Sequence, residues 1–312
     1  MSKLITVFGA TGIQGGSVVK GILSSPTLSK EYKIRAVTRD PQKKSAQDLA
    51  AHGVELAKAN LDNEASVKQA IDGSYAVFAV TNFWEKHSKE AEVKQGKAIA
   101  DSSKAAGVKH LVWSALPNVT KMTAGELSAV EHFDGKAEVM EYIDQTKGDM
   151  VATYFMAGCY MSNIKGMIRK GEDGVLTIRT PWVASETKLP LFDAGTDTGK
   201  YVAGILSQDP ERVNGLQVKT ASQWATPNEI VDTLTKVTGT TVKFQEIPEE
   251  VFQSFLPEKI AREVTENMLL LRDHSYYGKG AEKEQEKSDW VLGGEKTVSW
   301  EQFIQNNGPW QW

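Results

Sequence analysis

Three glycines near the N-terminus are the residues whose spacing points most directly to chemistry. Gly9, Gly12 and Gly15 follow the apolar run 4–8, and a helical pattern of apolar residues follows at 17–23. Glycine permits a tight turn at the first position, close approach of a pyrophosphate at the second and tight helix packing at the third. N–H groups at the helix start would then face the anion. The spacing is GxxGxxG rather than GxGxxG, and an ordinary strand-to-helix turn also uses glycine, but its place directly after a strand predicts dinucleotide binding.

Arg39 stands where nucleotide-binding proteins select between NAD and NADP. An acidic residue after the second strand usually binds the ribose 2′-hydroxyl of NAD, whereas this chain has Arg39, with Lys43 close behind. A guanidinium pairs with a 2′-phosphate through two hydrogen bonds, so the sequence favours NADP(H). Asp40 argues against this interpretation, and a solvated basic turn is the alternative.

Polar residues also follow the next predicted strands. Asn60–Asp62 come after the third strand and suit contact with adenine, while Thr81–Trp84 come after the fourth and suit the nicotinamide half. Asn and Asp are common in turns for backbone reasons, so their shared position carries the interpretation. Lys94 could reach the cofactor from its helix, or lie at the surface. Residues 158–161 follow the sixth strand, where backbone N–H groups and Tyr160 could lie across the nicotinamide; Cys159 is interpreted as a small buried residue.

Lys136 and His132 are the candidate catalytic residues. Short-chain dehydrogenases use a YxxxK pair, in which the tyrosine protonates the carbonyl oxygen and the lysine lowers its pKa. Here the corresponding residues read His132-Phe-Asp-Gly-Lys136, so the lysine is present and the tyrosine is absent. Histidine can act as an acid near neutral pH, but a structural role at the start of the helix is the favoured interpretation of His132. The missing tyrosine lowers the expectation of catalysis without removing it.

Strands and helices alternate through the first half of the chain, which predicts a doubly wound parallel α/β sheet with its ligand beyond the carboxyl ends of the strands. Strands are expected at 4–8, 32–38, 54–57, 75–80, 110–114 and 150–155, and helices at 43–51, 65–71, 90–106 and 131–145. We expect residues 1–157 to form the nucleotide-binding domain. Residues 158–312 are expected to form a smaller mixed α/β subdomain for substrate or partner, with helix 196–207 and strand 215–219 returning to the first domain.

Composition limits the remaining choices. The 312 residues carry a formal net charge of −4 and a single cysteine, so neither direct nucleic-acid binding nor an internal disulfide is expected. No CxxC or HExxH pattern occurs, and no metal site is predicted. The first strand begins so early that we expect no signal peptide. We also expect no membrane span and a cytoplasmic location, with an additional nuclear location left open.

The C-terminal part contains two further features. Residues 272–289, with Tyr276 and Tyr277, are predicted to form a mobile segment that closes over a pocket. Trp290 and Trp300 are expected in the core, while Trp310 and Trp312 either dock on a partner subunit or fray.

The motifs together resemble the NmrA-like family of atypical short-chain dehydrogenases. They are GATGIQGG (9–16), VTRD (37–40), VTNFWE (80–85), EVKQGK (92–97), HFDGK (132–136) and AGCYMSNI (157–164). The match is strong to about residue 165 and loose beyond it, and the motif order is closest to the HSCARG-type NADPH sensors. The resemblance implies a Rossmann domain that binds NADP(H) through Gly9, Ala10, Thr11, Gly12, Ile13, Gln14, Arg39, Lys43, Asn60, Leu61, Thr81, Asn82, Phe83, Lys94, Lys136, Gly158, Cys159, Tyr160 and Met161.

Two functions remain open at this point. The first is a redox sensor that regulates transcription, in which NADP(H) loading changes affinity for a regulatory protein partner. The second is an NADPH-dependent reductase of a small-molecule carbonyl, imine or enone. A homodimer is compatible with either function.

Overall fold

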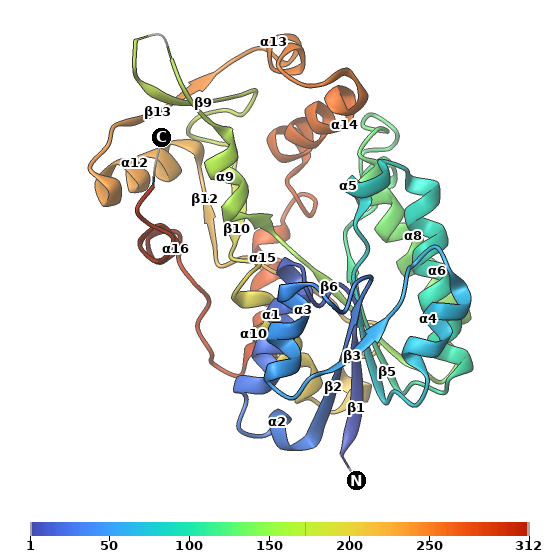
Figure 1. Ribbon diagram of the computed structural model, residues 1–312. Helices are drawn as coiled ribbons and strands as arrows, with labels where there is room; N and C mark the ends of the chain where they lie inside the picture. Colours follow the sequence, from blue (N-terminus) through green and yellow to red (C-terminus); the bar gives the residue numbers. More distant parts are fainter. Residues whose placement is uncertain (1, 172, 311–312) are drawn as a thin grey trace.

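A parallel sheet lies at the centre of the larger part of the molecule (Figure 1). The structure is a computed structural model that describes residues 2–171 and 173–310. Within these residues the sheet has seven strands in the order β11-β6-β5-β4-β1-β2-β3. They are β1 (Lys3–Val7), β2 (Tyr32–Thr38), β3 (Glu55–Lys58), β4 (Ala76–Ala79), β5 (His110–Ala115), β6 (Val151–Met156) and β11 (Gln217–Lys219). All neighbouring strands run parallel, as the doubly wound prediction requires.

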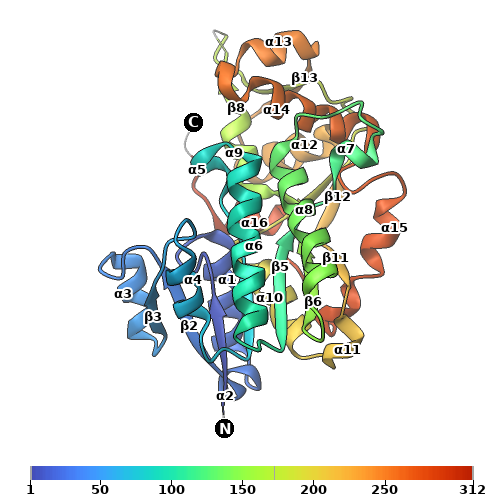
Figure 2. The same cartoon turned by 90° about the vertical axis from the view of Figure 1, so that its right-hand side faces the viewer.

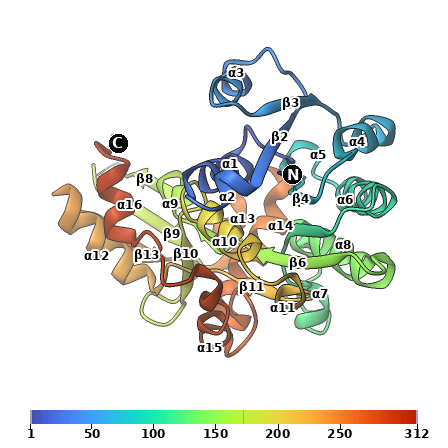
Figure 3. The ribbon, with the colours of Figure 1, turned by 90° about the horizontal axis from the view of Figure 1, so that it is seen from below.

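Helices cover both faces of this sheet (Figure 3). α1 (Ile13–Ser24) and α10 (Asp197–Leu206) pack together on one face, and α4 (Glu64–Ile71), α6 (Lys89–Ala105) and α8 (Glu131–Thr146) form the layer on the other. Every residue of β4, β5 and β6 is buried, which explains why apolar residues predominate in these strands. The shorter connecting helices are α2 (Leu28–Glu31), α3 (Lys44–Ala51), α5 (Phe83–Lys86), α7 (Val119–Met122) and α11 (Pro210–Val213).

Most of the remaining elements form a smaller mixed layer above the carboxyl ends of the strands (Figures 1 and 2). Two three-stranded sheets occur in this part of the described chain: β12 (Gln223–Ala225), β10 (Leu189–Phe192) and β7 (Cys159–Tyr160), then β13 (Val242–Glu246), β9 (Leu176–Thr180) and β8 (Ile168–Lys170). Its helices are α9 (Met161–Met167), α12 (Pro227–Thr238), α13 (Glu249–Ser254), α14 (Glu258–Leu269), η1 (Leu270–His274) and α16 (Trp300–Asn306). The helices α15 (Ala281–Glu286) and η2 (Asp289–Leu292) pack instead against β11 and α10 of the larger part.

The order of the sheet reverses beside β1, with β2 on one side and β4 on the other. At such a position the following helices leave toward opposite faces, so a crevice opens beyond the strand ends. None of the helices in the described residues is both long and apolar enough to cross a membrane.

Candidate functional site

A groove of about 450 Å³ lies beyond the carboxyl ends of β1 to β4. This volume is in the range of small-molecule sites. Of the residues predicted to bind the cofactor, those that line the groove are Gly9, Thr11, Gly12, Ile13, Gln14, Gly15, Arg39, Lys43, Asn60, Leu61, Thr81, Asn82 and Tyr160. Segments that are far apart in the chain therefore meet at one site.

The glycine turn leaves its backbone open to the groove. Gly9 has φ = +66°, and a Cβ atom at Gly15 would lie 2.3 Å from the Gly9 carbonyl oxygen, so a side chain fits at neither position. α1 begins at Ile13 without a side-chain cap and without an acidic residue in its first turn. Its first N–H groups are consequently available to an anion, as the sequence predicted.

Arg39 and Lys43 lie on the β2–β3 side of the groove. The Arg39 guanidinium contacts the Glu85 carboxylate of α5 at 2.5 Å, and both residues line the groove. On the same side Asp62 accepts hydrogen bonds from Lys86 (2.5 Å) and Gln95 (2.8 Å), and Lys86 lowers the pKa of this carboxyl group. Glu85 and Gln95 were not among the predicted site residues, because their charges and amides look like those of any exposed helix.

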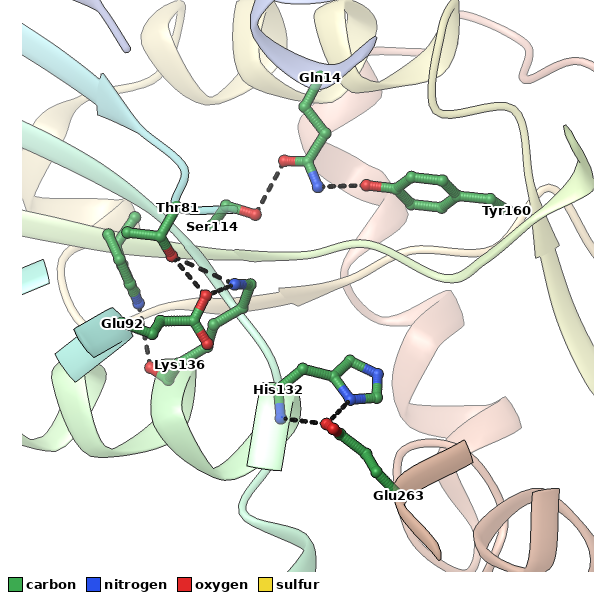
Figure 4. Close-up of polar contacts among 9 residues, drawn as sticks. Gln14, Thr81, Glu92, Ser114, His132, Lys136, Tyr160 and Glu263 are labelled. Carbon is green, nitrogen blue, oxygen red and sulfur yellow. Dashed lines mark hydrogen bonds and ion pairs between the residues drawn. The ribbon is translucent and has the colours of Figure 1, made fainter. Parts of the chain in front are cut away.

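Lys136 lies in a buried polar cluster next to the groove (Figure 4). Its ammonium group donates to Glu92 and, at 3.2 Å, to the hydroxyl of Thr81, which lines the groove. Glu92 is 2% exposed, and its Oε2 has no hydrogen-bond partner among the described residues. Because a buried charge is stable only when it is paired, Glu92 fixes the position of the Lys136 ammonium group.

A chain of hydrogen bonds connects Gln14, Ser114 and Tyr160 (Figure 4). Gln14 accepts from the Ser114 hydroxyl (2.8 Å) and donates to the Tyr160 phenol oxygen (2.5 Å). Burial raises the pKa of Tyr160, and the hydrogen bond from Gln14 opposes this shift. The side chain of Tyr160 thus enters the groove in its neutral form.

His132 faces α14 instead of the groove. Its Nδ1 atom lies 2.7 Å from the Glu263 carboxylate, which also accepts the backbone N–H of His132 at 3.0 Å (Figure 4). The imidazole packs against Trp84, with 4.9 Å between the ring centroids. These contacts are those of a residue that holds two parts of the fold together.

The other predicted residues lie behind or outside the groove. Ala10, Phe83 and Met161 are core side chains, and Lys94 lines a separate depression on the outer face of α6. Gly158 and Cys159 support the backbone behind Tyr160: the Gly158 N–H donates to Thr220, and Cys159 pairs with β10. Burial raises the pKa of the Cys159 thiol to about 12.

Two expectations about the C-terminal region are wrong. Tyr276 and Tyr277 do not cover a pocket; both are buried, and their hydroxyls donate to the carbonyls of Ala157 and Met156. Burial in the core stabilises two adjacent aromatic rings more than exposure in a surface loop would, which explains their position. Trp290 is 37% exposed and stacks on Arg212, although Trp300 is in the core as predicted.

Of the two C-terminal tryptophans, Trp310 lies within the described residues. Trp310 packs edge-on against Trp300 and donates to the Ile304 carbonyl at 3.0 Å. Trp312 lies outside the described residues.

Comparison with known proteins gives matches over most of the chain. The model of the NmrA-like family matches residues 1–304. The NmrA-like family domain-containing oxidoreductase ptmS of Penicillium ochrochloron is 32% identical over 260 residues, which cover 78% of this chain and 76% of that protein. The corresponding oxidoreductase himF of Aspergillus japonicus is 29% identical over 299 residues, which cover 90% of this chain and 88% of that protein.

Solved structures share the fold. The crystal structure of NmrA, a negative transcriptional regulator, in complex with NADP has a TM-score of 0.80 at 20% identity and covers 99% of both chains. The quinone oxidoreductase QOR2 of Escherichia coli in complex with NADPH has a TM-score of 0.74 at 22% identity, covering 97% of this chain and 99% of that one. At these identities the likeness concerns the fold.

Proposed function

This chain belongs to the NmrA-like family, and on that premise we propose that it binds NADP(H) in the groove beyond β1 to β4 and acts as a redox sensor. The observation that carries the proposal is the combination of an open α1 N-terminus, a glycine turn and the guanidinium of Arg39 in one groove. The α1 turn would hold the diphosphate and Arg39 with Lys43 the 2′-phosphate. In this proposal residues 1–157 carry most of the nucleotide contacts, and residues 158–312 present the face for a regulatory protein in the cytoplasm or nucleus.

The state of the proton donors favours sensing over turnover. Lys136 is engaged by Glu92, His132 is engaged by Glu263, and position 132 lacks the tyrosine of a YxxxK pair. A bound nucleotide would change the surface around the groove. A partner protein with different affinities for the loaded and the empty form would then bind according to nucleotide loading.

A reductase is the second candidate, and Tyr160 is the observation that favours it. Its neutral phenol lines the groove and accepts a hydrogen bond from Gln14, so its own O–H proton is left to protonate a substrate oxygen. NADPH supplies a hydride when it is bound. The relatives in Penicillium and Aspergillus are named as oxidoreductases.

Calorimetric titration with NADPH, NADP⁺, NADH and NAD⁺ tests the nucleotide proposal. We expect the phosphorylated pair to bind at least about tenfold tighter, because an arginine–phosphate contact is charge-assisted. Tighter binding of NADH and NAD⁺ would contradict the assignment of Arg39. A panel of carbonyls, imines, enones and quinones with NADPH then separates the two candidates: turnover that Lys136→Ala abolishes while nucleotide binding persists would replace the sensor with the reductase.

A further inference from the structure

Glu85 is placed against Arg39 from the opposite side of the groove. Arg39 follows β2, whereas Glu85 lies on α5 after β4, and β1 separates these two strands. Both side chains line the groove, and their charged atoms are 2.5 Å apart. The Glu85 carboxylate is thus paired with the guanidinium group that, in the proposed function, binds the 2′-phosphate.

The position of Glu85 is fixed by its neighbours in α5. Phe83 is 3% exposed and packs edge-on against Trp84, with 5.3 Å between the ring centroids. On the other side of Glu85, the Lys86 ammonium is 2.5 Å from the Asp62 carboxylate. A helix anchored at both ends keeps the Glu85 charge beside the groove when Arg39 turns toward a ligand.

The other acidic groups that line the groove are directed elsewhere. Asp62 is engaged by Lys86 and Gln95, and Asp40 accepts the backbone N–H of Gln42 at 3.0 Å. Glu85 is therefore the groove carboxylate that competes for Arg39 in the described chain.

The pair is weak enough to be displaced. The Arg39 side chain is 65% exposed and that of Glu85 is 43% exposed, so water and salt screen their attraction. A phosphate group carries more charge than a carboxylate and binds a guanidinium through two hydrogen bonds.

We propose that Glu85 is a specificity-determining residue, which competes with the nucleotide 2′-phosphate for Arg39 and thereby limits the preference for NADP(H) over NAD(H). This inference rests on the proposed function, because it presupposes a phosphorylated nucleotide in the groove. It identifies the acidic residue that limits how strongly Arg39 binds the 2′-phosphate.

Calorimetric titration of Glu85→Gln with NADPH and NADH at low and high salt tests this inference. We expect NADPH to bind about three- to tenfold tighter than to the wild type at low salt, and NADH to change by less than about twofold. The gain should shrink at high salt, because screening already weakens the competing carboxylate. Unchanged or weaker binding of NADPH by a folded Glu85→Gln protein would overturn the inference.

Two variants serve as controls. Glu31→Gln removes the same charge from a similar ion pair, Lys3–Glu31 at 2.5 Å, which lies at the start of β2, at the opposite end of that strand from Arg39. It should leave both affinities unchanged, and an equal gain in this control would assign the effect to net charge and overturn the inference. In the Arg39→Ala background, Glu85→Gln should change NADPH binding by less than about twofold. Absence of NADPH binding by the wild type would refute the proposed function itself, whereas wild-type binding without a gain in Glu85→Gln refutes only the role of Glu85.

Discussion

The role of Lys136 depends on its buried partner as well as on its side-chain type. Lys136 was expected beside the cofactor, and its ammonium group reaches Thr81 at the groove, but it does so from a buried pair with Glu92. The two partners are separated by 44 positions in the chain. A pairing over this distance depends on how α6 and α8 pack, so the isolated motif HFDGK could not reveal it.

His110 supplies a prediction about pH. Burial lowers its pKa from 6.5 to about 4, so protonation favours the unfolded chain. The stability that neutral His110 provides is complete above pH 6.5 and falls as the pH drops from 6.5 to about 4, with a total loss of about 3 kcal/mol. Urea unfolding from pH 7.5 to 4.5 should therefore give a shallower pH dependence for His110→Gln than for the wild type. The exposed His52→Gln should keep the wild-type slope, and equal slopes in all three proteins would contradict the assignment.

Helices α1 and α10 approach each other closely, although they come from distant parts of the chain. The N–H of Gly199 donates to the Ser17 hydroxyl at 2.8 Å, and a Cβ atom on Gly199 would lie 2.1 Å from the Ser17 carbonyl oxygen. Gly199→Ala should therefore force the helices apart and lower the free energy of unfolding by about 2–4 kcal/mol. Thermal and urea unfolding measure this effect. Gly166→Ala is the matched control, since nothing lies within 4 Å of its added methyl group, and a similar loss there would contradict the packing explanation.

The sequence predicted the elements of the first half well. The expected strands and helices between residues 32 and 155 begin and end within two residues of those observed, because long apolar runs and helical periods mark them, whereas α1 begins at Ile13, four residues before the expected pattern at 17–23. Thr226 caps α12 and forms a capping box with Glu229. β7, β8 and β12 were missed, since strands of two or three residues have no period and depend on partners such as Leu191. α5 was missed for the same reason, and with it the position of Glu85.

At the scale of the whole molecule, α14 holds the smaller layer against the larger one. Glu266 is 9% exposed, and its Oε2 accepts the N–H groups of Ser128 (2.7 Å) and Ala129 (2.6 Å) just before α8. Glu263 makes the neighbouring contact with His132. Two carboxylates one turn apart on α14 thus accept the backbone N–H groups of Ser128, Ala129 and His132 in the other layer.

Glu266→Ala should weaken this connection. Two partly buried N–H groups lose the carboxylate that accepts their hydrogen bonds, so we expect a loss of about 1–3 kcal/mol in the free energy of unfolding. Differential scanning calorimetry and limited proteolysis measure the stability and the exposure of the 127–132 segment. The exposed Glu258→Ala on the same helix should behave like the wild type. Equal stability of the two variants would show that the layers are held together by other contacts.

The edge strand β11 affects when the large sheet can complete its fold during synthesis. β11 and α10 come after residue 196, yet β11 pairs with β6 and α10 covers α1. Until residues 197–219 have left the ribosome, β6 has an unpaired edge and the apolar side of α1 is uncovered. The nucleotide-binding half therefore completes its fold only after much of the other half has left the exit tunnel, and chaperones have an interval in which to bind it.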